Sequence, residues 1–175
     1  MRRPYGNMRE SLEQLYDGHA QALFAFLLNL TRNEADTRDL LQEVFCKIAR
    51  RPDLLDGARD RRAFLLAIAH NLALDLIRRR AARERKHDAL ASESPVVFEQ
   101  ASDLDEQCCR EALSAALAEL PEEQRAVIHL KLWEGLTFEA IAETLGIPAN
   151  TAASRYRYGI DKLRALLRPI YGELR

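Results

Sequence analysis

Apolar residues recur at steps of three and four along most of the chain, which is the spacing of one buried face of an α-helix. A first helix is predicted from about Ser11 to Leu30, a second after Asn33, which can cap it, and a third from about Arg61 to Lys86. Residues 52–60 break the pattern, and residues 1–7 are expected to be disordered. The side chains expected to face the core are Leu12, Leu15, Tyr16, His19, Leu23, Phe26, Leu27, Leu30, Leu40, Leu41, Val44, Phe45, Ile48, Phe64, Ile68, Leu72 and Leu76.

The second half of the chain repeats the helical spacing after an interruption. Residues 89–102 are rich in serine, proline and acids and have little periodicity, which predicts a linker. Helices are then predicted over about 103–118, 122–134, 137–145 and 148–167, with the last one ending near Pro169. No stretch has the alternation of a strand. We therefore predict an all-α fold of two small helical domains, 8–87 and 103–175, joined by a flexible acidic linker, 88–102.

The stretch from Thr137 to Arg155 has the pattern of a helix-turn-helix. Thr137 can cap the first helix, Gly146 supplies the residue past its end, and Pro148 suits the start of the second. Side chains of the second helix can reach base edges and phosphates in a major groove. An ordinary helical hairpin is the alternative interpretation. Gly159 lies inside this helix and should cost it about 1 kcal/mol relative to alanine.

The net charge of −1 hides a strong polarity along the chain. Residues 78–86 hold six basic residues and one acid, giving +5, and residues 150–175 hold six basic residues and two acids, giving +4. Residues 88–106 hold six acids and no lysine or arginine, giving −6. Two basic helical ends separated by an acidic connector favour a nucleic-acid partner more than the net charge does.

Other classes of function find little support in the sequence. No run approaches the roughly 18 apolar residues of a membrane span, and the N-terminus lacks an apolar signal core. The three cysteines, Cys46, Cys108 and Cys109, fit a reducing cytoplasm; the vicinal pair could sense redox state or metals, but a packing role is expected. No catalytic, cofactor-binding or metal-binding spacing is present, so we expect neither an enzyme nor a metalloprotein.

Three motifs in order resemble a known family. They are the segment 39–45 (DLLQEVF), the segment 62–80 (RAFLLAIAHNLALDLIRRR), and the segment 120–125 (LPEEQR) with the helix-turn-helix that follows. The chain resembles bacterial RNA polymerase sigma factors of the extracytoplasmic-function (ECF) group over about residues 11–168. The expected function is to direct core RNA polymerase to specific promoters and to assist promoter opening.

The resemblance implies three sets of site residues. The residues implied in polymerase docking are Asp39, Leu40, Gln42, Glu43 and Phe45. The residues implied in binding the −10 promoter element are Asn71, Asp75, Arg78, Arg79 and Arg80. The residues implied in binding the −35 element are Asn150, Thr151, Ala153, Ser154, Arg155, Arg157 and Tyr158.

The resemblance also implies the partners of the chain. They are core RNA polymerase, through its β′ clamp helices and β flap, promoter DNA and an anti-sigma factor, with no membrane insertion. The acidic linker is either a spacer or a polyanion mimic in the RNA-exit path. Two rival functions stay open at this point: a sigma-like decoy that titrates an anti-sigma factor, and a stand-alone helix-turn-helix repressor. The basic run, Asn71 and the segment 39–45 count against both.

Overall fold

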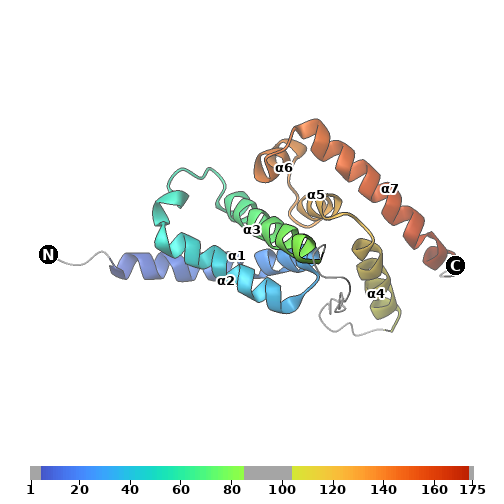
Figure 1. Cartoon of the computed structure of the whole chain (residues 1–175), viewed down its shortest axis with the longest axis horizontal. Helices are drawn as coiled ribbons and strands as arrows, with labels where there is room; N and C mark the ends of the chain where they lie inside the picture. Colours follow the sequence, from blue (N-terminus) through green and yellow to red (C-terminus); the bar gives the residue numbers. More distant parts are fainter. Residues whose placement is uncertain (1–4, 85–103, 174–175) are drawn as a thin grey trace. The chain divides into compact units, whose positions relative to one another are not determined.

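Two helical units, each with its own core, make up the fold. The computed structural model describes residues 5–84 and 104–173, and over these ranges it contains seven α-helices, one short 3-10 helix and no strand (Figure 1). Contacts divide the chain into unit 1, Met1–Glu93, and unit 2, Ser94–Arg175. The all-α prediction is confirmed, while the predicted linker, 88–102, lies outside the described residues. Within the described ranges, no helix is both long and apolar enough to cross a membrane.

Unit 1 is a three-helix arrangement in which each long helix contacts the other two. Its elements are α1 (Tyr5–Thr31), α2 (Glu34–Arg50), a 3-10 turn η1 (Pro52–Leu55) and α3 (Arg61–Glu84). Apolar side chains with at most 2% of their surface exposed fill the space between the helices. These residues are Leu23, Phe26, Leu27, Leu30, Val44, Ile48, Leu65, Leu66, Ala69 and Ala73.

The buried faces of α1 and α3 differ in part from the predicted ones. Helix α1 begins at Tyr5, so residues 5–7, which were expected to be disordered, are helical. On this helix Tyr16 is 47% exposed and His19 only half-buried. On α3 the fully buried positions are Leu65, Leu66, Ala69 and Ala73, whereas the predicted Phe64, Leu72 and Leu76 are half-buried. Helix α3 is apolar on more than one side, so the spacing alone did not identify the face against α1 and α2.

Unit 2 contains α4 (Leu104–Ala118), α5 (Glu122–Leu132), α6 (Phe138–Leu145) and α7 (Ala149–Glu173). Its central cluster consists of Ala116, Leu117, Leu120, Ile128 and Leu163. Helix α7 starts one residue after Pro148, whose carbonyl accepts the first-turn N–H groups of Thr151 and Ala152. The helix also continues past Pro169, where it was predicted to end.

Gly159 lies where α7 passes close to α5. It is buried, and a Cβ atom added to it would lie 2.6 Å from Cδ1 of Ile128 and 3.3 Å from Cβ of Gln124. The sequence predicted only the cost of this glycine to the helix. The structure adds its use, because any larger residue would have to displace a fully buried isoleucine.

Three other side chains are not packed in a core. Cys46 and Cys109 are both exposed, so the packing role expected for the vicinal pair is wrong for Cys109. The side chain of Cys108 lies outside the described part of the structure. At the end of α5, the half-exposed ring of Trp133 stacks on the buried ring of His129, with 5.2 Å between ring centroids.

Candidate functional site

Helix α2 packs its apolar inner face into the unit 1 core, which leaves its polar outer face exposed. Its cap is the predicted one: Asn33 accepts the N–H of Asp36 on its side-chain oxygen, 3.0 Å away. Of the residues predicted for docking, Leu40 and Phe45 are buried in the unit 1 core. The other three, Asp39, Gln42 and Glu43, are exposed and share the outer face with Cys46.

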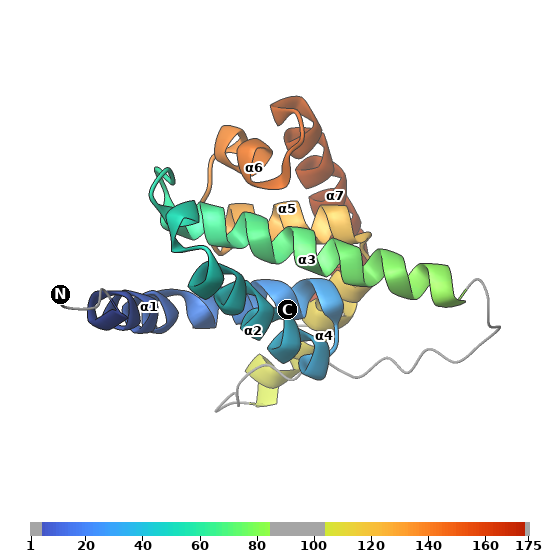
Figure 2. The same ribbon diagram turned by 60° about the vertical axis from the view of Figure 1, so that its left-hand side comes forward.

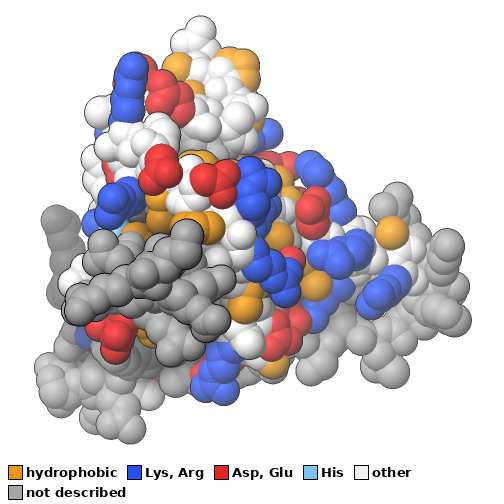
Figure 3. All heavy atoms as spheres, turned by 90° about the vertical axis from the view of Figure 1, so that its left-hand side faces the viewer, with side chains coloured by type: hydrophobic (Ala, Val, Ile, Leu, Met, Phe, Trp, Pro, Cys, Tyr) orange, Lys and Arg blue, Asp and Glu red, His pale blue; other side chains and the backbone are white. Residues whose placement is uncertain are grey.

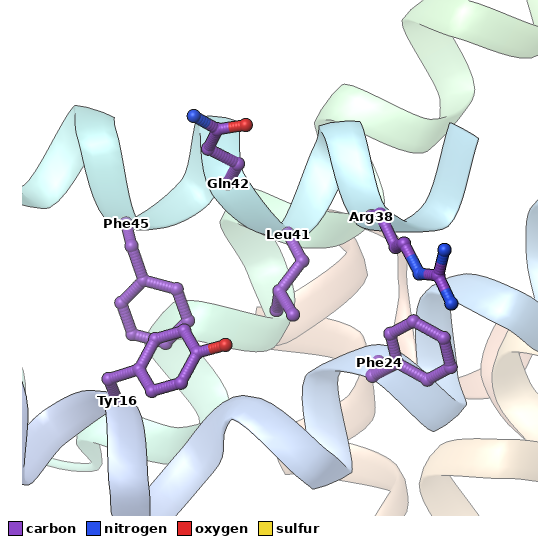
Figure 4. Close-up of a pocket in the computed structure, with 6 residues that line it drawn as sticks. All are labelled: Tyr16, Phe24, Arg38, Leu41, Gln42 and Phe45. Atoms are coloured by element: carbon purple, nitrogen blue, oxygen red, sulfur yellow. The ribbon is translucent and has the colours of Figure 1, made fainter. Parts of the chain in front are cut away.

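A small, mainly apolar groove lies between α1 and α2 beside this outer face. Figure 4 shows the ring of Tyr16 against that of Phe45, Leu41 pointing into the groove, Arg38 reaching over the ring of Phe24, and Gln42 pointing away. The Tyr16 and Phe45 ring centroids are 4.8 Å apart. Sequence reasoning missed this groove, because the helical spacing placed Tyr16 in the core.

The outer face of α3 carries most of the residues predicted for the −10 element. Asn71, Asp75, Arg78 and Arg79 are all exposed. With about 100° of rotation per residue, Asn71, Asp75 and Arg78 lie within about 60° of one another around the helix. Arg79 is held along its own helix, since its Nε donates to the carbonyl oxygen of Asp75, 3.0 Å away.

Arg80 differs from the other residues predicted for the −10 element. Its Nη1 lies 2.5 Å from Oδ2 of Asp36 in the first turn of α2. Only 16% of the Asp36 side chain is exposed. The pair therefore joins α3 to α2.

The helix-turn-helix has the predicted local geometry. Thr137 Oγ1 accepts the N–H of Ala140, 3.2 Å away, and Gly146 takes the left-handed conformation, with φ 65° and ψ 38°. At the start of α6, the pKa of the exposed Glu139 carboxyl is held below its usual value. The main cause is a hydrogen bond from the backbone N–H of Glu139 itself, and the second is a hydrogen bond from the Thr137 hydroxyl. Ile141 and Ala152 are fully buried, so α6 and α7 are fixed against each other.

The outward face of α7 presents polar side chains near its beginning. Asn150, Arg157 and Tyr158 are exposed, whereas Thr151, Ala153, Ser154 and Arg155 are half-buried. Because residues two apart differ by about 200° around a helix, Arg157 points directly away from the buried Gly159. Its guanidinium lies 5.1 Å from the ring centroid of Tyr158. The hydroxyl of Ser154 donates to the carbonyl oxygen of Thr151, 3.0 Å away.

Charges of both signs are mixed on the face drawn in Figure 3, where lysine and arginine side chains alternate with aspartate and glutamate. Among the described side chains, no group of three or more His, Cys, Asp or Glu is placed to hold a metal ion.

Two family models match the chain. Residues 15–83 match the one described as Sigma-70 region 2, and residues 116–165 match Sigma-70, region 4. SigL of Mycobacterium tuberculosis, an ECF RNA polymerase sigma factor, is 33% identical over 161 residues, which cover 91% of this chain and 90% of SigL. The RNA polymerase sigma factor CarQ of Myxococcus xanthus is 32% identical with the same coverage.

Solved structures have a similar fold. RpoE of Bartonella quintana, determined with the anti-sigma factor NepR, gives a TM-score of 0.78 at 24% identity, covering 91% of this chain and 98% of that one. CnrH, determined with the cytosolic domain of CnrY, gives a TM-score of 0.66 at 26% identity, covering 92% and 90%.

Proposed function

Because this chain belongs to the ECF sigma factors, which direct bacterial RNA polymerase to promoters, we propose that its two units divide that task between them. Unit 1 docks the polymerase and opens the −10 element, and unit 2 reads the −35 element. The observation that carries this proposal is the presence of both family regions in one chain, each within a unit that has its own core.

Docking is assigned to the exposed face of α2. Asp39 and Glu43 present carboxylates and Gln42 presents an amide, which suit basic and polar side chains of the β′ clamp helices. Leu40 and Phe45 support this face from the core side. The groove beside Phe45 gives the same surface an apolar component, as protein interfaces require at their centre.

Promoter contacts are assigned to α3 and α7. On α3, Asn71 offers both a donor and an acceptor to a base edge, while Arg78 and Arg79 offer phosphate contacts. On α7, Arg157 and Asn150 lie on the outermost face, which favours them for base contacts. The half-buried Arg155, on the flank of the helix, suits a phosphate. RNA synthesis itself is left to the polymerase, so no residue of this chain is assigned a catalytic role.

Further partners and boundaries belong to the same proposal. Domains of 8–87 and 103–175, joined by residues 88–102, would let the two DNA-reading units reach separate promoter elements. Docking of unit 2 on the β flap completes the polymerase contacts. The anti-sigma factor present in the RpoE structure favours a similar inhibitor for this chain. Because its partner is the polymerase, the protein acts in the cytoplasm.

The test is a gel shift of promoter DNA by the full chain, with and without core polymerase. We expect a promoter-specific shift only with core enzyme, because a net charge of −1 gives the free protein little attraction to DNA. Run-off transcription on the same fragments should follow the shift. Tight, specific binding by the free chain would instead support a stand-alone repressor, and core binding without any transcript would support a decoy.

The division of labour is tested with promoter variants. Asn71→Ala should lower promoter opening and alter the preference at the −10 element while the −35 profile stays unchanged. Arg157→Ala should alter the preference at the −35 element while the −10 profile stays unchanged. If either substitution altered both profiles equally, the assignment of one element to each unit would be wrong.

A further inference from the structure

The basic C-terminal half of α3 is weakly packed. The last fully buried side chain of this helix is Ala73, and every residue from Leu74 to Arg83 is half-buried or exposed. Figure 2 shows this end of α3 projecting past α1 and α2. Arg78 and Arg79 lie on this projecting segment, so apolar packing alone restrains their position only loosely.

Arg80 points away from its two basic neighbours and back towards the core side of α3. Seven residues separate it from the buried Ala73, which places the two within about 20° around the helix, whereas Asn71 lies about 180° away. Long side chains in helices also lean towards the N-terminus. The guanidinium of Arg80 therefore reaches back to the bundle, where it meets Asp36.

Asp36 is well suited to anchor that contact. It lies in the first turn of α2, where the helix dipole favours a carboxylate, and its own N–H is fixed by the side chain of Asn33. Only 16% of its side chain is exposed, against 44% for Arg80. The fixed partner is thus Asp36 on the well-packed α2, and the partner held in place is Arg80 on the projecting end of α3.

We propose that Asp36 is a positioning residue for promoter opening: through Arg80 it ties the basic half of α3 to α2 and so holds Arg78 and Arg79 where they meet DNA phosphates. This Asp36–Arg80 tether rests on the proposed assignment of α3 to the −10 element. In this proposal Arg80 contacts the protein itself, whereas Arg78 and Arg79 contact DNA. It also means that the acidic residue Asp36 favours promoter opening.

The sign of that effect separates the tether from simple electrostatics. Asp36→Asn removes a negative charge, which by itself should favour DNA binding. The tether predicts the opposite, a roughly two- to fivefold loss of promoter opening, as for other partly exposed ion pairs. Arg80→Gln should give the same loss, and the double variant no more than either single one. Asp36→Glu, which keeps the carboxylate, should retain most of the opening.

The matched control is Glu34→Gln. Glu34 lies in the same first turn of α2, and its replacement by glutamine removes one negative charge, as Asp36→Asn does. The ion-pair partner of Glu34, however, is Arg38 on the same helix. Opening by this variant should equal that of the wild type or exceed it. Circular dichroism of each variant checks that the helices are retained.

The experiment measures permanganate reactivity of the −10 element by the full chain with core polymerase, over a range of salt concentrations, and core affinity in parallel. The tether predicts a lower salt slope for Asp36→Asn, although no cation has been removed, with core affinity unchanged. Wild-type opening by Asp36→Asn together with defective opening by Arg80→Gln would overturn it, because Arg80 would then act on DNA directly. Additive losses in the double variant would overturn it as well. A wild-type chain that opens no promoter would instead overturn the proposed function.

Discussion

Replacing Gly159 by alanine sets two effects of known sign against each other. Alanine is favoured over glycine inside a helix by about 1 kcal/mol, so at an open position the change would stabilise α7. At Gly159 the new Cβ would lie 2.6 Å from Cδ1 of Ile128, closer than side-chain atoms approach. Forcing an extra methyl group into a packed core costs about 1–3 kcal/mol. We therefore expect Gly159→Ala to lower the free energy of unfolding of unit 2 by up to about 2 kcal/mol.

A second substitution identifies the clash as the cause. Ile128→Val removes the offending Cδ1 atom and should by itself cost about 0.5–1.5 kcal/mol. In that background Gly159→Ala should become neutral or stabilising by up to about 1 kcal/mol. Gly18→Ala in α1 is the control, since nothing lies within 4 Å of its added Cβ. This change should stabilise the chain by about 1 kcal/mol.

The free energies can be measured in the full chain by hydrogen exchange of amides in α5 and α7, which reports on unit 2, and of amides in α1, which reports on the Gly18→Ala control in unit 1. The two substitutions at the contact should be strongly coupled. Additivity within about 0.5 kcal/mol would refute the close-approach explanation. So would a stabilising effect of Gly159→Ala alone that matches the effect of Gly18→Ala.

Three further predictions concern the docking face of α2, the start of α6 and the outward face of α7. Glu43→Arg should weaken binding to core polymerase by about tenfold without loss of helicity, because the residue is exposed and away from the core; equal affinity in a pull-down would exclude this face from docking. Thr137→Val should raise the pKa of Glu139 towards its usual value in an NMR titration. Since the pKa of Glu139 is lowered in the folded chain, its carboxylate stabilises the fold at pH values above its pKa in the unfolded chain. This stabilisation is lost as the pH falls through the pKa of the folded chain. An unchanged pKa in Thr137→Val would show that the hydroxyl plays no part. Arg157→Ala should relax the preference at one −35 position by roughly 1–3 kcal/mol, whereas Arg155→Ala should weaken all sequences alike; identical profiles would remove base reading from both.

Features that depend on neighbouring residues could be predicted from the sequence. The cap at Asn33, the cap at Thr137 and the left-handed Gly146 all follow from local backbone chemistry, and all three are present. The same holds for the buried face of α2, because its apolar and polar residues separate cleanly. The promoter-facing and docking residues come from resemblance to a family, and they stay predictions that need the experiments above.

Features that depend on a residue across the core could not be predicted. From the sequence Gly159 indicated only a lower helix stability, whereas the structure shows that it allows close packing against Ile128. In the sequence Arg80 was only one member of a basic run, whereas the structure shows it paired with Asp36 in the first turn of α2. The rotation of α3 was missed for a related reason, because small alanines such as Ala69 and Ala73 mark its closest contacts and contribute little to a hydrophobic pattern.

The chain has a single tryptophan, Trp133, and it lies in unit 2 at the end of α5. Its tryptophan fluorescence therefore comes from one place, and the tyrosines of both units contribute only weaker emission. The indole is half-exposed and stacked on the ring of His129, so its emission should respond when that contact opens or when a partner covers it. An unmodified chain thus carries a built-in optical probe of one unit, which can follow the unfolding of that unit or its binding to polymerase without an added label.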